Sequence, residues 1–130
     1  MAGVAIVRIG KRDKFGRASK EERTLDGITF DSKAEMRRWN QLQSLLKCGG
    51  IRDLRRQVPF VWSETLTNEA TGATMTRQGR YVADFVYIDA LGKEHIEDVK
   101  GHETREYKRK RRVMRALFNV TIEEIKPSQI

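Results

Sequence analysis

Two acidic residues and a lysine stand in a stretch of the chain that is otherwise mostly apolar. They are Asp84, Asp98 and Lys100. Two carboxylates held close together repel each other, and the pKa of one of them rises unless a cation lies between them. Oxygen ligands without a cluster of His or Cys favour Mg²⁺ or Mn²⁺ over zinc. These residues therefore indicate a metal site with an adjacent lysine, and an exposed Asp98–Lys100 ion pair without function is the alternative.

A β-hairpin would bring the three residues together. Residues 81–88 and 94–100 are rich in β-branched and aromatic side chains, and a turn-forming segment separates them. If Ile88 pairs with Glu94 across the turn, the two acids face each other and the lysine follows on the same face. The first strand is apolar on both faces, which predicts a central strand of a sheet. One face is expected to carry Tyr81, Ala83, Phe85 and Tyr87, and the other Val82, Val86 and Ile88.

The spacing of these residues is similar to a known motif. Asp84, thirteen intervening residues and then DVK at 98–100 resemble the D…(D/E)xK signature of the PD-(D/E)xK nuclease superfamily. Ala83 stands where the motif has its proline. The blocks GITFDSKAE, Gln57 before an apolar run, ADFVYID and EDVKG follow one another in the order of a family of small, mostly phage-encoded proteins of that superfamily. The resemblance covers about residues 24–126.

The resemblance implies an α/β fold with a restriction-endonuclease-like core, in which helices flank a mixed central sheet. It also implies hydrolysis of phosphodiester bonds in DNA. Glu35, Asp84 and Asp98 would hold one or two Mg²⁺ or Mn²⁺ ions, with the backbone carbonyl of Val99 as a further ligand. Lys100 would orient or activate the attacking water and offset charge that develops on the phosphate.

Glu35 has two interpretations. A helix is predicted over residues 32–47, because Ser32 and Glu35 form a capping box and a Gly-Gly pair follows the helix. Glu35 also lies on the apolar stripe of this helix, one turn before Trp39, so its carboxylate is expected to point inward. A capping residue and a metal ligand both remain open. Gln57 is implied by the resemblance to support the site, and a surface polar residue is the alternative.

The composition fits one domain that has a polyanionic partner. The chain has 130 residues, 26 Lys and Arg against 18 acids, a net charge of +8 and a pI near 9.9. Cys48 is the single cysteine, which excludes an internal disulfide framework and fits a reducing compartment. No apolar run is long enough to span a membrane, so the expected location is the cytoplasm, or the host cytoplasm if the protein is phage-encoded. Residues 1–23 are expected to form a basic arm and residues 24–130 the nuclease domain.

A second helix is predicted over residues 103–118. Its apolar stripe would dock on the sheet, and its other face is nearly all basic. Such cations repel one another at i,i+4 spacing, and phosphates would relieve the repulsion, although a solvated charged face is the alternative. The cations expected to contact DNA are Arg105, Lys108, Arg109, Arg111, Arg112 and Arg115. Other predicted elements are a turn at Asp26-Gly27, two strands at 51–57 and 58–64 or one bent strand over both, an exposed loop at 65–74 and a strand at 120–125.

These features predict a metal-dependent DNA endonuclease. No base-reading motif is present, so backbone and shape recognition is expected, for instance of Holliday junctions or replication intermediates. A homodimer would follow if two strands must be cut. The alternative is a non-catalytic nucleic-acid-binding protein that retains the nuclease fold.

Overall fold

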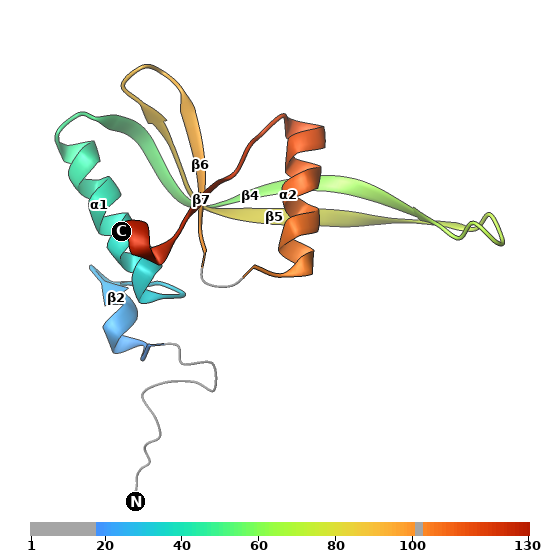
Figure 1. Cartoon of the computed structure of the whole chain (residues 1–130), viewed down its shortest axis with the longest axis horizontal. Helices are drawn as coiled ribbons and strands as arrows, with labels where there is room; N and C mark the ends of the chain where they lie inside the picture. Colours follow the sequence, from blue (N-terminus) through green and yellow to red (C-terminus); the bar gives the residue numbers. More distant parts are fainter. Residues whose placement is uncertain (1–17, 101–102) are drawn as a thin grey trace, which may run out of the picture.

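The computed structural model describes residues 18–100 and 103–130, and its centre is a four-stranded mixed sheet (Figure 1). The strands lie in the order β4 (Ile51–Thr67), β5 (Thr74–Asp89), β6 (Glu94–Val99) and β7 (Glu123–Ile125). β4 with β5 and β5 with β6 pair antiparallel, and β6 with β7 pair in parallel. The predicted α/β class with a mixed central sheet is therefore confirmed.

The hairpin of β5 and β6 has the predicted register. Ile88 pairs with Glu94, and the ladder continues to the pair of Phe85 and Glu97. The next residue beyond this pair on each strand is one of the two acids of the motif. β5 is longer than predicted, because it begins at Thr74 rather than near residue 81.

Two helices begin at side-chain caps. α1 (Lys33–Lys47) follows Ser32, whose hydroxyl accepts a hydrogen bond from the Glu35 amide at 3.1 Å. α2 (Arg105–Phe118) follows Thr104, whose hydroxyl accepts a hydrogen bond from the Tyr107 amide at 3.1 Å. Both predicted helices are confirmed, and in each a Ser or Thr side chain satisfies an amide of the first turn that has no partner within the helix.

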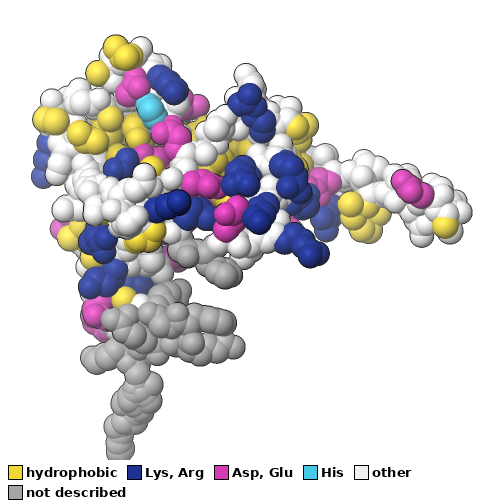
Figure 2. Space-filling view, viewed as in Figure 1, with side chains coloured by type: hydrophobic (Ala, Val, Ile, Leu, Met, Phe, Trp, Pro, Cys, Tyr) yellow, Lys and Arg dark blue, Asp and Glu magenta, His cyan; other side chains and the backbone are white. Residues whose placement is uncertain are grey.

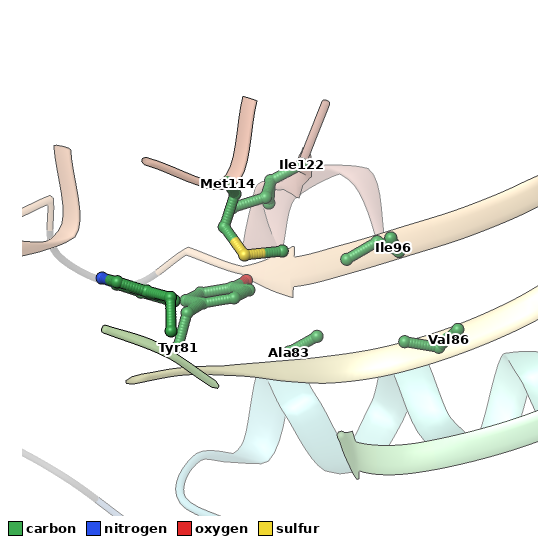
Figure 3. Close-up of a cluster of buried hydrophobic side chains, with 7 residues drawn as sticks. Tyr81, Ala83, Val86, Ile96, Met114 and Ile122 are labelled. Atoms are coloured by element: carbon green, nitrogen blue, oxygen red, sulfur yellow. The ribbon is translucent and has the colours of Figure 1, made fainter. Parts of the chain in front are cut away.

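The helices cover opposite faces of the sheet. Neighbouring strand residues point to opposite faces, and Phe85 packs in a cluster with Leu42 of α1. Val86 packs in the other cluster with Met114 of α2 (Figure 3). The predicted alternation along β5 is wrong in part, because Tyr81 and Ala83 pack with the α2 cluster and Phe85 and Tyr87 with the α1 cluster. The side chains switch faces around Asp84. The residue of β4 that faces Asp84 is Gln57, whose backbone is left-handed.

β4 and β5 continue beyond the body of the protein as a two-stranded ribbon (Figure 1). The pairing extends to Thr67 and Thr74, so β4 is one strand of 17 residues, which matches the predicted alternative of a single strand and extends it beyond residue 64. The predicted exposed loop at 65–74 is therefore shorter than expected. The remaining turn is exposed, and Asn68 closes it by accepting hydrogen bonds from the amides of Ala70 and Thr71.

The described part of the N-terminal region packs on the fold. A 3₁₀ helix, η1 (Glu21–Arg23), precedes the small hairpin of β2 (Thr24–Leu25) and β3 (Ile28–Thr29), whose predicted Asp-Gly turn is present. Arg23, predicted to belong to the basic arm, is buried and donates to the carbonyl of Phe30 at 2.6 Å. Residues 1–17 of that arm lie outside the described residues.

The remaining elements are short or lie at the C-terminus. β7 covers only half of the strand predicted at 120–125. A second 3₁₀ helix, η2 (Pro127–Gln129), ends the chain close to α1, where Arg37 donates to the carbonyl of Pro127 at 3.5 Å. Among the described residues, no helix has the length and apolar character needed to cross a membrane.

Candidate active site

Glu35 lies in the first turn of α1 and is buried, with 4% of its surface exposed. Its amide donates to the hydroxyl of Ser32, so the predicted cap is present. Its carboxylate points inward, where Oε1 accepts a hydrogen bond from Nε2 of Gln57 at 3.2 Å. Burial and the nearby carboxylate of Asp31 raise the pKa of Glu35 to about 7. Ser32 therefore caps the helix through the Glu35 amide, whereas the Glu35 carboxylate is directed to Gln57 and does not complete the predicted capping box.

Asp84 lies within β5, at the point where the ladder to β6 ends. Its Oδ2 accepts a hydrogen bond from the amide of Val99 at 2.8 Å, so a side chain replaces the next backbone contact between the strands. Its Oδ1 accepts a longer hydrogen bond from Gln57 at 3.4 Å. Burial, followed by the neighbouring carboxylates of Glu35 and Asp98, raises the pKa of Asp84 to about 8.

Asp98 and Lys100 lie at the end of β6 and beside α2. Nζ of Lys100 is 3.7 Å from Oδ2 of Asp98, and the two side chains are only 13% and 15% exposed. The alternative of an exposed ion pair is therefore wrong. The same ammonium lies 3.3 Å from the centre of the Tyr107 ring, a cation–π contact that fixes its position. Burial raises the pKa of Asp98.

Gln57 connects the acids from β4. The pairs on either side of it place it opposite Asp84, and its amide nitrogen donates to both Glu35 and Asp84. Its backbone is left-handed, with φ of 54°. This conformation costs roughly 1–2 kcal/mol in a residue with a Cβ atom, and such strain often accompanies function. Gln57 therefore hydrogen-bonds to two of the acids and is not a surface polar residue, while its support of a functional site stays a prediction.

Two polar side chains that the sequence did not identify flank this cluster. Among the described residues, Nε of Arg56 and the hydroxyl of Tyr81 are buried atoms without a hydrogen-bond partner. The guanidinium of Arg56 lies 5.0 Å from the centre of the Phe30 ring, and its charge lowers the pKa of Glu35. Tyr81 is 5% exposed, and its pKa is raised by burial and then by the charge of Asp98. The only sequence signal for Arg56 is its place next to Gln57.

The acid cluster, defined as Glu35, Asp84 and Asp98, has the donor chemistry of a site for a hard divalent cation. Its donors are oxygen atoms, they are largely buried, and the pKa of each carboxyl is raised. A cation between them would offset both the repulsion and the desolvation. However, no three His, Cys, Asp or Glu side chains within residues 18–100 and 103–130 are grouped so that they could hold a metal ion. The residues therefore fit a metal by chemistry, while their positions do not form a closed coordination site.

The cations of α2 divide into two groups. Arg109 forms ion pairs with Glu64 at 2.8 Å and with Glu106 at 3.1 Å. Arg111 pairs with Glu124, and Arg115 donates to the hydroxyl of Thr121. The other cations that were predicted to contact DNA are exposed and form no ion pair within the described part of the chain. They are Arg105, Lys108 and Arg112. Figure 2 shows Lys and Arg side chains gathered over α2 with acidic side chains beside them.

Comparison of the chain with known protein families identifies one family, and that family has no assigned activity. A family model described as a protein of unknown function matches residues 12–128, a span that contains the whole acid cluster and Lys100. No curated protein and no solved structure matches the chain. The function must therefore be argued from the geometry of the site.

Proposed function

The chain belongs to the DUF1064 family, and from its site we propose that it is a metal-dependent endonuclease that hydrolyses phosphodiester bonds in DNA. The observation that carries this proposal is the convergence of the acid cluster and Lys100 at one place between two helices. A protein that only binds nucleic acid has no need for buried carboxyls, because they repel phosphate and destabilise the fold.

The proposed roles follow from the positions of the side chains. Glu35, Asp84 and Asp98 would hold one or two Mg²⁺ or Mn²⁺ ions, with the carbonyl of Val99 as a further ligand. Bound metal would polarise a phosphoryl oxygen and lower the pKa of a water molecule. Lys100, held by the Tyr107 ring, would orient that water and offset negative charge on the phosphate.

Gln57 would keep two of the carboxylates in place between turnovers. Its amide donates to one oxygen of Glu35 and one of Asp84, which leaves the second oxygen of Glu35 available to a cation. The mixed sheet with a helix on each face supports the proposal of a restriction-endonuclease-like core.

The proposed substrate is branched or structured DNA, such as a Holliday junction or a replication intermediate. The exposed cations of α2 suit phosphate contacts, and phosphate contacts carry no sequence information. A homodimer would supply two active sites if both strands of such a substrate are cut.

A non-catalytic DNA-binding protein with a retained nuclease fold is the second candidate. The observation that favours it is that no three acidic side chains in the described residues are grouped closely enough for a metal ion. This candidate predicts binding without cleavage under every metal condition.

Cleavage assays separate the two candidates. The wild-type protein is incubated with linear, nicked, flapped and four-way DNA in the presence of Mg²⁺, Mn²⁺ or EDTA. We expect cleavage with either metal and none with EDTA. Asp98→Asn should abolish cleavage and leave DNA affinity equal or higher, because the loss of a negative charge does not weaken attraction to phosphate.

Asp26→Asn is the matched control for this substitution. Asp26 is an exposed turn residue with φ of 52°, a conformation that Asn tolerates, so the control loses the same charge away from the cluster and should cut normally. Cleavage by Asp98→Asn at the wild-type rate would remove Asp98 from the site. DNA binding without cleavage by the wild type under all conditions would establish the non-catalytic candidate.

A further inference from the structure

A groove between β5 and α2 leads away from the acid cluster. Its inner part has a volume of ≈ 370 Å³ and is lined by residues of both elements, among them Tyr81, Asp98 and Tyr107. A second hollow of ≈ 280 Å³ lies toward the ribbon and is lined by Gly79 and Arg109, among others. Both parts share Arg80, Glu106 and Lys110, so they form one continuous groove that begins at a proposed metal ligand.

The charge of this β5–α2 groove is positive, because its acids are already neutralised. Glu106 pairs with Arg109, Glu64 pairs with Arg109 and Arg77, and Asp98 pairs with Lys100. Arg80 and Lys110, in contrast, form no ion pair within the described residues. Arg80 belongs to β5 and Lys110 to α2, so the free cations come from both walls of the groove.

Tyr81, which lines the groove, carries a buried hydroxyl that lacks an acceptor within the described part of the chain. Tyr81 lines the inner part, and Figure 3 shows its hydroxyl pointing toward the end of β6, the strand that carries Asp98. Among the described residues nothing accepts a hydrogen bond from this hydroxyl. Leaving a buried donor unsatisfied costs about 1–3 kcal/mol, so this hydroxyl gains an acceptor if the groove wall opens to an oxygen atom of a ligand.

We infer that the β5–α2 groove binds the sugar–phosphate backbone of one DNA strand next to the phosphodiester bond that is cut. Two unpaired cations on facing walls suit consecutive phosphates, and the start of the groove at Asp98 places those phosphates beside the reacting one. This inference rests on the proposed nuclease function for the position of the strand, but the binding itself does not require cleavage.

The first test measures binding without catalysis. Fluorescence anisotropy of a labelled oligothymidylate in EDTA is followed over a series of salt concentrations. Arg80→Ala combined with Lys110→Ala should lower the affinity and reduce the slope of log affinity against log salt by roughly 1.4, that is, two contacts of about 0.7 each for single strands. The control Lys47→Ala combined with Lys93→Ala removes the same charge outside the groove. An equal change in both double variants would overturn the inference.

The second test locates the contact on the DNA. Single phosphates on either side of the cleavage site are replaced one at a time by neutral methylphosphonates. Replacement of a phosphate that the groove holds should weaken binding by the wild type but should not further weaken binding by the Arg80→Ala and Lys110→Ala variant. Equal effects on both proteins at every position would contradict the inference.

Tyr81→Phe provides a third test with two readouts of opposite sign. The variant should have an equal or higher melting temperature, because a buried hydroxyl without an acceptor is removed, and a lower affinity for the oligothymidylate. A lower melting temperature with unchanged affinity would show a purely structural hydroxyl and would exclude Tyr81 from the groove.

Failure of this inference and failure of the nuclease proposal give different results. If the groove variants bind poorly and the wild type never cuts DNA, the groove is the binding site of a non-catalytic protein. If the wild type cuts DNA and the groove variants bind and cut like their control, the nuclease stands and the groove inference is wrong.

Discussion

The helix cap at Glu35 and its proposed metal-binding role are separated by one substitution. The hydroxyl of Ser32 accepts a hydrogen bond from the Glu35 amide, which the substitution does not change, so Glu35→Gln keeps the cap and removes the charge. If Glu35 holds metal, activity should collapse, the required Mg²⁺ concentration should rise, and the melting temperature of the metal-free protein should be unchanged or higher. Cleavage rates over a Mg²⁺ titration and a thermal melt in EDTA measure these effects.

Ser32→Ala is the complementary control. It removes the hydroxyl that accepts from the Glu35 amide and leaves the carboxylate in place. We expect a loss of about 1 kcal/mol in the free energy of unfolding with little change in the Mg²⁺ requirement. Full activity of Glu35→Gln at low Mg²⁺ would leave only Asp84 and Asp98 as ligands.

The raised pKa of Asp84 predicts how the stability of the metal-free protein depends on pH. Its pKa is about 8 in the folded protein against an ordinary value of 3.8, so the folded state binds this proton more strongly than the unfolded state. The free energy of unfolding should therefore fall as pH rises between these two values. Asp84→Asn should flatten that decline. Melting temperatures in EDTA over a pH series test this, and parallel curves for the two proteins would contradict it.

At the scale of single residues, the sequence identified the charged side chains that stand among apolar ones. Carboxylates in an apolar hairpin and on an apolar helical stripe are visible as exceptions, so the acid cluster could be predicted. Tyr81 and Arg56 could not, because a tyrosine in a buried strand and an arginine in a half-exposed one are ordinary. Their significance lies in missing hydrogen-bond partners, and only the folded chain reveals these.

The ribbon and α2 are joined at the scale of elements by one side-chain network. Glu64 of β4 accepts hydrogen bonds from the Trp62 indole, from Arg77 of β5 and from Arg109 of α2. The Trp62 ring also lies against Phe118 of α2, at 6.3 Å between ring centres. This network, together with the aromatic contact, fixes the outer part of the β5–α2 groove.

Gly79→Ala should disrupt this junction. A Cβ atom at Gly79 would lie 2.1 Å from Nε1 of Trp62, so the indole would have to move away from Glu64. We expect a loss of roughly 1–3 kcal/mol in the free energy of unfolding, measured by denaturant titration. Gly50→Ala is the control, because a Cβ atom there has its nearest neighbour at 3.5 Å. Equal stability of the two variants would show that the indole position is not fixed.

The hairpin of β5 and β6 could be predicted at the element scale, whereas the ribbon could not. Strands that are rich in apolar residues can be predicted from their composition, and Ile88 and Glu94 flank a turn that the sequence also predicts. The outer ribbon is polar and rich in threonine, so residues 65–67 and 74–80 resemble a loop in the sequence. They form strands because cross-strand pairs such as Thr65 with Thr76 stabilise a ladder that starts in the core.

At the scale of the whole molecule, the cations are of two kinds: those that form ion pairs within the fold and those that are available to bind phosphate. Lys108→Ala combined with Arg112→Ala removes exposed cations without ion pairs in the described chain, so affinity for duplex DNA should fall and the salt slope should drop by about 0.9 per lost phosphate contact. The melting temperature should not change.

Arg109→Ala should instead lower the melting temperature, because it breaks ion pairs with Glu64 and Glu106. Anisotropy titrations and thermal melts distinguish these outcomes, and an unchanged salt slope would mean that the face is only solvated.

The irregular backbone of β4 has a consequence for the behaviour of the protein in concentrated solution. β4 is an outer strand of the described sheet, and a long regular outer strand is a template for aggregation. Pro59 has no amide hydrogen to donate, and Asp53 and Gln57 have left-handed backbones that interrupt the row of donors and acceptors. The residue that orients an amide toward the acid cluster thus also discourages edge-to-edge association, and a substitution that straightens β4 at Gln57 would impair both.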